Sequence, residues 1–142
     1  MHYNYKHTLH LCFIFYLYSL SVKSYWELWH WGHQTNQTPP YRLLTAYDFD
    51  RSTPQVFKAE KALFSKIRKV IQTVDQLSVD NGYVANMDAY KHMTTQQKDE
   101  LYRQGYEKLL SKFPPRNPQG ASRRVGEICI RTVYADVMRY CN

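Results

Sequence analysis

Hydrophobic residues recur at helical spacing along one long stretch in the middle of this chain. If the stretch is helical, they fall on a single face, with polar and basic residues on the opposite side. Thr53 and Pro54 predict its start, because threonine caps free backbone amides and proline is tolerated at the first helical position. Asp80-Asn81-Gly82 is a turn-forming end. The stripe comprises Val56, Leu63, Ile67, Val70, Val74 and Leu77, flanked by Phe57, Phe64 and Ile71.

Two further segments show the same periodicity. Thr94, with Gln97 three residues later, matches a capping box, so a second helix is predicted from about residue 95 to Pro114-Pro115. A third helix is predicted after Ser122, although alternating apolar residues from 128 to 134 are also compatible with a strand. One helical turn is expected around residues 87–90. The second apolar face comprises Leu101, Tyr102, Gly105, Tyr106, Leu109, Leu110 and Phe113, and the third comprises Val125, Ile128, Val133, Val137 and Tyr140.

Amphipathic helices with apolar faces this wide must cover one another to fold. We therefore predict an all-α fold, a small antiparallel helical bundle of about three helices that occupies residues 53–142. Residues 25–52 are the least regular stretch of the sequence and include a proline pair at 39–40. We expect them to form an irregular, aromatic-rich arm that wraps the domain.

The first 24 residues have the pattern of a secretory signal peptide. Lys6 precedes an uncharged, largely apolar run from residue 8 to residue 22, and Val22 and Ser24 place small residues at positions −3 and −1 of a cleavage site. The predicted cut lies between Ser24 and Tyr25, with Ser21 as the alternative end. We therefore expect a secreted, extracellular protein.

A membrane anchor is the alternative interpretation of the same run. Fifteen helical residues reach only about 22 Å, which is short of the roughly 30 Å hydrocarbon core of a bilayer. The three tryptophans that follow the run nevertheless occupy the position of an interfacial aromatic belt. Contact with a membrane is expected only if the N-terminal segment stays uncleaved.

Export through the secretory pathway has two chemical consequences. Asn36 begins an Asn-Gln-Thr sequon, which predicts N-glycosylation of a secreted eukaryotic chain.

Loss of the signal peptide would leave Cys129 and Cys141 as the remaining thiols, which predicts a disulfide bond. In one continuous helix the two would lie about 18 Å apart, whereas a disulfide needs Cα atoms roughly 5.5 Å apart. The tail must then fold back, or the bond must join two chains as a disulfide-linked dimer, or the thiols stay reduced.

Residues suited to catalysis are few. A chain of 142 residues has room for one domain, which excludes a multidomain enzyme. His30 and His33 have a spacing that two metal ligands can share, but a closed zinc site needs four ligands, so packing or exposure is the favoured interpretation. There is neither a nucleophile-elbow serine nor a glycine-rich phosphate loop. We predict a non-enzymatic protein with no catalytic residue, cofactor or metal.

The basic residues of the chain could attract an acidic surface, a glycan or anionic lipid. The chain has a formal net charge of +7, and lysines and arginines line the polar side of the central helix. Glu60 and Asp75 interleave with them in the sequence, which favours an ordinary solvated face. Nucleic acid is not expected as a partner of an exported chain without a recognition motif. Because aromatic and arginine side chains dominate interface energetics, the predicted interaction residues are Trp26, Trp29, Trp31, Lys58, Lys61 and Arg68.

Together these patterns predict a secreted, small, basic helical protein that acts by binding an extracellular protein or a cell-surface partner. One alternative is a carrier of an apolar small molecule, with tryptophan rings lining its pocket. Another is a cationic membrane-active protein. A third is a peptide precursor, because cleavage after the dibasic pair Arg123-Arg124 would release residues 125–142.

Overall fold

The computed structural model describes residues 21–33, 38–49, 51–115 and 130–141. Within these ranges the chain is all-α, as the sequence predicts, and contains no β-strand. The α-helices are α2 (Val22–Trp31), α3 (Pro54–Asp80), α4 (Thr95–Lys112) and α6 (Ile130–Cys141). Three 3₁₀ turns connect them, η2 (Tyr41–Leu43), η3 (Ala46–Asp48) and η4 (Met87–His92).

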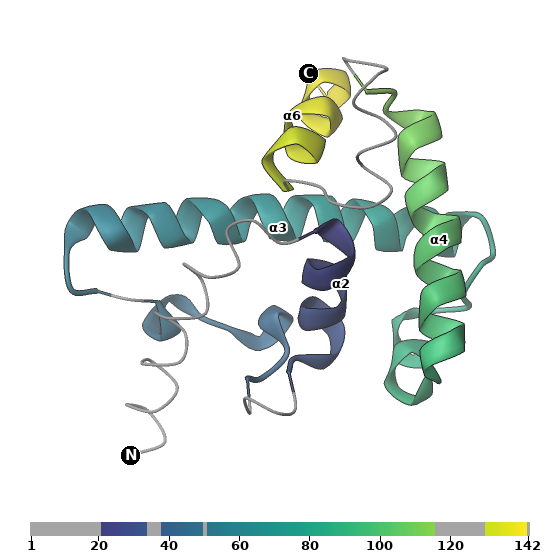
Figure 1. The fold of residues 1–142 in the computed structure, drawn as a ribbon, viewed down its shortest axis with the longest axis horizontal. Coiled ribbons are helices and arrows are strands. Elements are labelled where there is room, and N and C mark those ends of the chain that lie inside the picture. Colours follow the sequence, from purple (N-terminus) through teal and green to yellow (C-terminus); the bar gives the residue numbers. More distant parts are fainter. Residues whose placement is uncertain (1–20, 34–37, 50, 116–129, 142) are drawn as a thin grey trace.

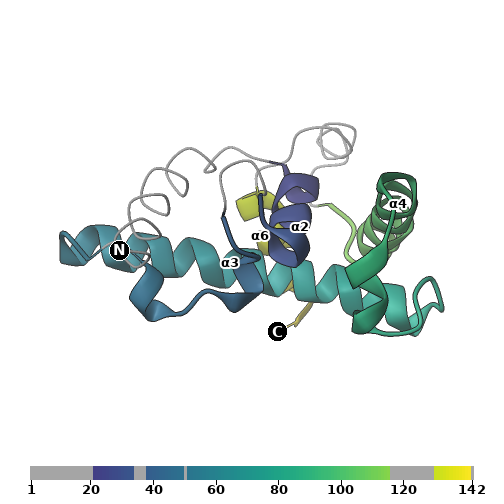
Figure 2. The same ribbon diagram turned by 90° about the horizontal axis from the view of Figure 1, so that it is seen from below.

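The long helix α3 forms the axis of the molecule, and the other helices pack across it (Figure 1). Viewed from below, α2 and α6 lie near the middle of α3, whereas α4 lies near its C-terminal end (Figure 2). α3 contacts α2, α4 and α6, so it is the element that joins the others. The arrangement is bundle-like, with α2 and α4 crossing the long axis of α3 (Figure 1).

Local sequence signals set the ends of α3 and α4. The Thr53 side chain accepts a hydrogen bond from the backbone N–H of Val56 at 3.1 Å, and Pro54 is the first residue of α3. Thr94 and Gln97 form the predicted capping box at the start of α4. The predicted starts of α3 and α4 are therefore confirmed. Such starts can be predicted from the sequence because a cap acts within one turn of the chain.

The predicted irregular arm is wrong at its beginning, since residues 25–31 belong to α2. Ser21 caps this helix by accepting a hydrogen bond from the backbone N–H of Ser24 at 3.2 Å. Gly32 ends it with φ of 70°, a conformation that glycine adopts without steric cost. The buried stripe at intervals of three and four residues is the signal that the sequence interpretation missed, and it comprises Val22, Tyr25, Trp26, Leu28 and Trp29.

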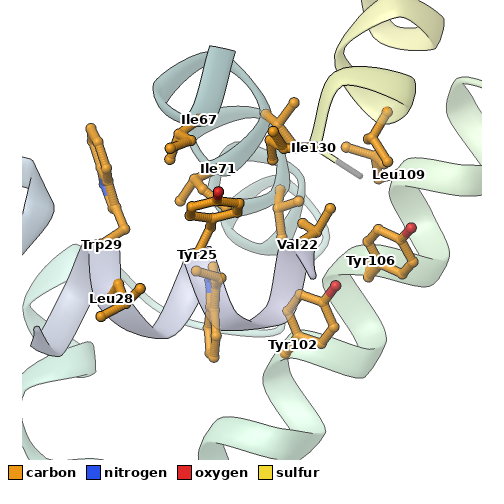
Figure 3. Close-up of a cluster of buried hydrophobic side chains, with 14 of the residues drawn as sticks. Val22, Tyr25, Leu28, Trp29, Ile67, Ile71, Tyr102, Tyr106, Leu109 and Ile130 are labelled. Atoms are coloured by element: carbon orange, nitrogen blue, oxygen red, sulfur yellow. The ribbon is translucent and has the colours of Figure 1, made fainter. Parts of the chain in front are cut away.

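The hydrophobic core collects side chains from all four helices. In Figure 3, the side chains of α2 face α3, with those of α4 and the first residue of α6 beside them. Tyr25 and Trp26 are fully buried, even though tyrosine carries a hydroxyl group and tryptophan an indole N–H. The labelled residues of this cluster are Val22, Tyr25, Leu28, Trp29, Ile67, Ile71, Tyr102, Tyr106, Leu109 and Ile130.

The last described helix resolves an ambiguity of the sequence. Residues 130–134 are helical, so the strand alternative is wrong there, and Val133 and Val137 of α6 are fully buried. The predicted start at Ser122 lies outside the described residues. Among the described helices, none is both long and apolar enough to span a bilayer.

α4 approaches α3 closely at Gly105. A Cβ atom at this position would lie 2.5 Å from the Ser78 hydroxyl and 3.1 Å from a methyl group of Val74. The Ser78 hydroxyl is itself fixed, because it donates a hydrogen bond to the Val74 carbonyl at 3.1 Å. A glycine in mid-helix is thus explained by packing rather than by local backbone preference.

We expect Gly105→Ala to lower the free energy of unfolding by about 1–2 kcal/mol, because overpacking exceeds the gain in helix propensity. In a Ser78→Ala background the added methyl group meets no hydroxyl, and the same substitution should cost less. Urea denaturation of the two single variants and the double variant measures this coupling. Strictly additive effects would contradict the proposed contact.

Candidate functional site

A buried carboxylate in α3 joins three elements of the fold. Asp75 is only 4% exposed, and its Oδ1 accepts hydrogen bonds from Trp26 Nε1 at 3.0 Å and from the Tyr90 hydroxyl at 2.9 Å. Its Oδ2 lies 2.8 Å from His30 Nε2, which donates because a carboxylate only accepts. We call Trp26, His30, Asp75 and Tyr90 the buried polar centre.

Aromatic rings enclose this centre. The His30 ring stacks on Tyr90 with centroids 4.0 Å apart, and Trp31 Nε1 donates to the Tyr90 carbonyl at 2.8 Å. Burial, reinforced by the nearby Asp75 carboxylate, raises the pKa of the Tyr90 phenol well above its usual range, so Tyr90 remains a donor. The geometry ties α2, α3 and η4 together, which favours a stabilising role for the centre.

The two histidines of the HxxH pattern are not brought together. His30 is buried against Asp75, whereas His33 follows the turn at Gly32 and is exposed. Their different surroundings agree with the packing-or-exposure interpretation of the sequence. Across residues 21–33, 38–49, 51–115 and 130–141, no group of three or more His, Cys, Asp or Glu side chains is arranged to hold a metal ion.

The tryptophans predicted as interaction residues pack inward. Trp26 is fully buried and Trp29 is 5% exposed, which corrects the expectation that both present their rings to a partner. Trp31 is partly buried, with the Lys98 ammonium 4.1 Å from the centroid of its ring. Their amphipathic helix turns these large side chains toward α3, where burial of their apolar area stabilises the fold.

The other predicted interaction residues lie on the outer surface of α3. At 100° per residue, its basic side chains occupy an arc of about 160° opposite the buried stripe. Lys58, Lys61 and Arg68 are all exposed. We call this surface the basic outer face of α3, and it comprises Lys58, Lys61, Lys66, Arg68 and Lys69.

The acidic residues that interleave with these charges in the sequence are absent from the outer face. Glu60 is 2% exposed and Asp75 is 4% exposed, since both fall in register with the buried Phe64 and Ile71. The expected interleaving of Glu60 and Asp75 with the basic side chains is therefore wrong, whereas the basic face itself is solvent-exposed. Among residues 51–74 the charges that reach the surface are all positive.

Aromatic rings hold several of these cations close to the helix surface. Phe57 has the Arg51 guanidinium 4.8 Å and the Lys61 ammonium 5.2 Å from its ring centroid. The Arg68 guanidinium lies 5.9 Å from the centroid of Phe64. Such contacts restrict the positions of the charges.

A solvent-open groove of about 710 Å³ runs beside this face, and we call it the α3 groove. Its wall includes Trp29, with Phe64 5.6 Å away between ring centroids. Arg42 of η2 and Arg68 of α3 also line it. The remaining lining residues are Leu44, Gln72, Asp75, Gln76, Val79, Ala85, Asn86 and Met87.

The predicted modification sites are only partly described. Cys141 ends α6 as an exposed free thiol, and the part of the chain that the structure describes contains no disulfide. Cys129, the sequon residue Asn36 and the dibasic pair Arg123-Arg124 lie outside the described residues.

Comparison of the chain with models of protein families, with curated proteins and with solved structures finds no match.

Proposed function

We propose that this chain is a non-enzymatic binding protein that docks an acidic surface of a protein or cell-surface partner onto the basic outer face of α3. The observation that carries the proposal is the burial of Glu60 and Asp75, at 2% and 4% exposure. Burial of both carboxylates leaves five cations on the face and no acidic side chain among them. A surface whose charges are all positive favours an acidic partner over a neutral or basic one.

The spacing of the cations favours joint action on one partner. Lys58 and Lys69 are separated by eleven residues of helix, a length of about 17 Å. Successive cations of the face are one to five residues apart in the sequence, a rise of about 2–8 Å along the helix axis, which is comparable to the Debye length of about 8 Å at physiological salt. Their potentials therefore add over the face, and association with an acidic surface should weaken as salt rises.

We also propose that the protein is secreted, but with a signal peptide that ends earlier than Ser24. Val22 is 1% exposed in the core, and the Lys23 ammonium lies 2.8 Å from an Asp99 carboxylate oxygen of α4. A cut after Ser24 would remove both contacts, whereas a cut after Ser21 would keep the whole of α2. We therefore favour Ser21 as the end of the proposed signal peptide, and intact-mass analysis of the secreted protein reads this boundary directly.

Neutralising the outer face should abolish most partner binding. We expect the triple variant Lys58→Gln, Lys61→Gln, Lys69→Gln to bind cultured cell surfaces about tenfold more weakly than the unchanged protein, since each exposed ionic contact contributes roughly 0.5 kcal/mol. Flow cytometry of the fluorescently labelled protein measures the apparent affinity. Raising the salt concentration should reduce binding of the unchanged protein and affect the variant less.

The matched control removes the same charge elsewhere. Its substitutions lie on η4 and α4, as Lys91→Gln, Lys108→Gln and Lys112→Gln, and should leave binding nearly unchanged. Equal losses in the two triple variants would show that net charge alone drives binding and would contradict a defined face. Equally tight binding to protein-free vesicles containing phosphatidylserine would replace the proposal with the membrane-active alternative.

A carrier function is the second candidate, and the α3 groove is the observation that favours it. Its volume of about 710 Å³ lies within the range of small-molecule sites, and Trp29 lines it as the carrier alternative expects.

A further inference from the structure

We propose that the α3 groove is a binding site for an amphipathic small molecule that carries a single carboxylate on an apolar, ring-sized body. Arg42 and Arg68 would hold the carboxylate, and the wall formed by Trp29 and Phe64 would contact the body. This site is additional to docking on the outer face, with which it shares only Arg68.

The wall suits a flat or branched apolar group. Trp29 and Phe64 are inclined at 39° with centroids 5.6 Å apart, and the buried Phe49, which is not part of the lining, lies 5.3 Å from Phe64. Leu44, Val79 and Met87 add aliphatic surface to the lining, and Met87 is 47% exposed. Trp29 and Phe64 are only 5% and 8% exposed, so the apolar surface that a ligand body would cover comes mainly from Met87, with Leu44 and Val79 half-buried beside it.

Arg68 places a positive charge next to the apolar wall of the groove. Its guanidinium lies 5.9 Å from the Phe64 centroid, so the positive charge sits directly beside the apolar wall. Arg42 supplies a second guanidinium from a different element, η2. A planar guanidinium presents paired N–H donors that match the two oxygens of a carboxylate, which selects this anion over a neutral polar group.

Asp75 is the acidic residue of the lining, and its charge is already engaged. Both of its oxygens contact buried groups, Trp26 and Tyr90 at Oδ1 and His30 at Oδ2. The side chain is 6% exposed. The amide groups that line the groove, Gln72, Gln76 and Asn86, are neutral, so the exposed charge of the lining is positive.

The test compares two probes that differ only in the head group, 1-pyrenebutyrate and the neutral 1-pyrenebutanol. Fluorescence anisotropy of each probe is titrated with the purified full chain. We expect the carboxylate to bind about tenfold more tightly than the alcohol, the factor that corresponds to one or two partly screened charged hydrogen bonds. Arg42→Gln and Arg68→Gln should each remove most of this difference while leaving binding of the alcohol unchanged.

Two further variants separate this site from the outer face. Lys58→Gln should leave the binding of both probes unchanged, although it belongs to the docking face. Gln72→Trp, which places a bulky side chain on the wall of the groove, should weaken both probes. Circular dichroism of every variant establishes that the fold is retained.

Equal affinity of the two probes, or retention of the preference for the carboxylate in both arginine variants, would overturn the proposal. Loss of the preference in Lys58→Gln as strongly as in Arg42→Gln would also overturn it, because binding would then reflect general positive charge. The outer-face proposal would survive either result, since its test uses lysines that do not line the groove.

Discussion

Asp75→Ala is expected to lower the free energy of unfolding by about 3–5 kcal/mol, a large fraction of the roughly 5–15 kcal/mol that stabilises a domain. The substitution leaves three buried donors, on Trp26, His30 and Tyr90, without the oxygens that accept from them. Each such donor then bears the cost of burial without a compensating hydrogen bond. Urea denaturation followed by tryptophan fluorescence measures the loss.

Asp75→Asn separates charge from hydrogen bonding at the same position. Its Oδ1 can still accept from Trp26 and Tyr90, and its amide can donate to a neutral His30, so we expect a smaller loss of about 1–2 kcal/mol. Gln72→Ala, on the exposed side of α3, is the control and should change the stability by less than about 0.5 kcal/mol. A loss at Asp75→Ala no larger than that of the control would show that the buried polar centre does not stabilise the fold.

Gly32→Ala should destabilise the protein by about 3 kcal/mol, for two additive reasons. Gly32 has φ of 70°, which an L side chain adopts at a cost, and a Cβ atom there would lie 2.3 Å from the Thr38 carbonyl oxygen. That oxygen accepts a hydrogen bond from the backbone of His33 at 3.0 Å, so it cannot move without breaking the bridge that follows α2. Thermal and urea denaturation both report the change.

Gly82→Ala is the matched control for this substitution. Gly82 has nearly the same φ, 73°, but a Cβ atom there would meet nothing within 4 Å. Only the backbone cost of about 1 kcal/mol applies, so the difference between the two alanine variants isolates the collision with the Thr38 carbonyl. Equal losses at the two glycines would contradict the close packing of the Gly32 turn.

Helix starts were the most predictable part of this fold, because their signals are local. The Thr53 and Thr94 side chains each accept from a backbone N–H three residues later, an interaction that the sequence pattern alone specifies. α2 was missed although its stripe also has helical spacing. The proposed signal-peptide boundary at Ser24 separated its first turn from the rest of the helix.

The candidate sites were less predictable, because each depends on contacts between distant segments. His30 and Asp75 are 45 residues apart in the sequence, and no spacing rule pairs them. Arg42 and Arg68 line one groove only because η2 packs against α2, which in turn packs against α3. The inward packing of Trp26 and Trp29 likewise requires α3 as a partner surface.

The sequence by itself determined the all-α class, the ends of α3 and α4, and the stripe of α3 that is buried, because these depend on interactions within a few residues of helix. Glu60 and Asp75 also fall in register with that stripe, a relation that the sequence interpretation missed when it assigned both residues to the solvated face. Only the tertiary structure decided that both carboxylates are buried and that Asp75 accepts hydrogen bonds from Trp26, His30 and Tyr90. The reason is that burial and hydrogen-bond partners are set by which helix packs where, and packing joins residues that are remote along the chain.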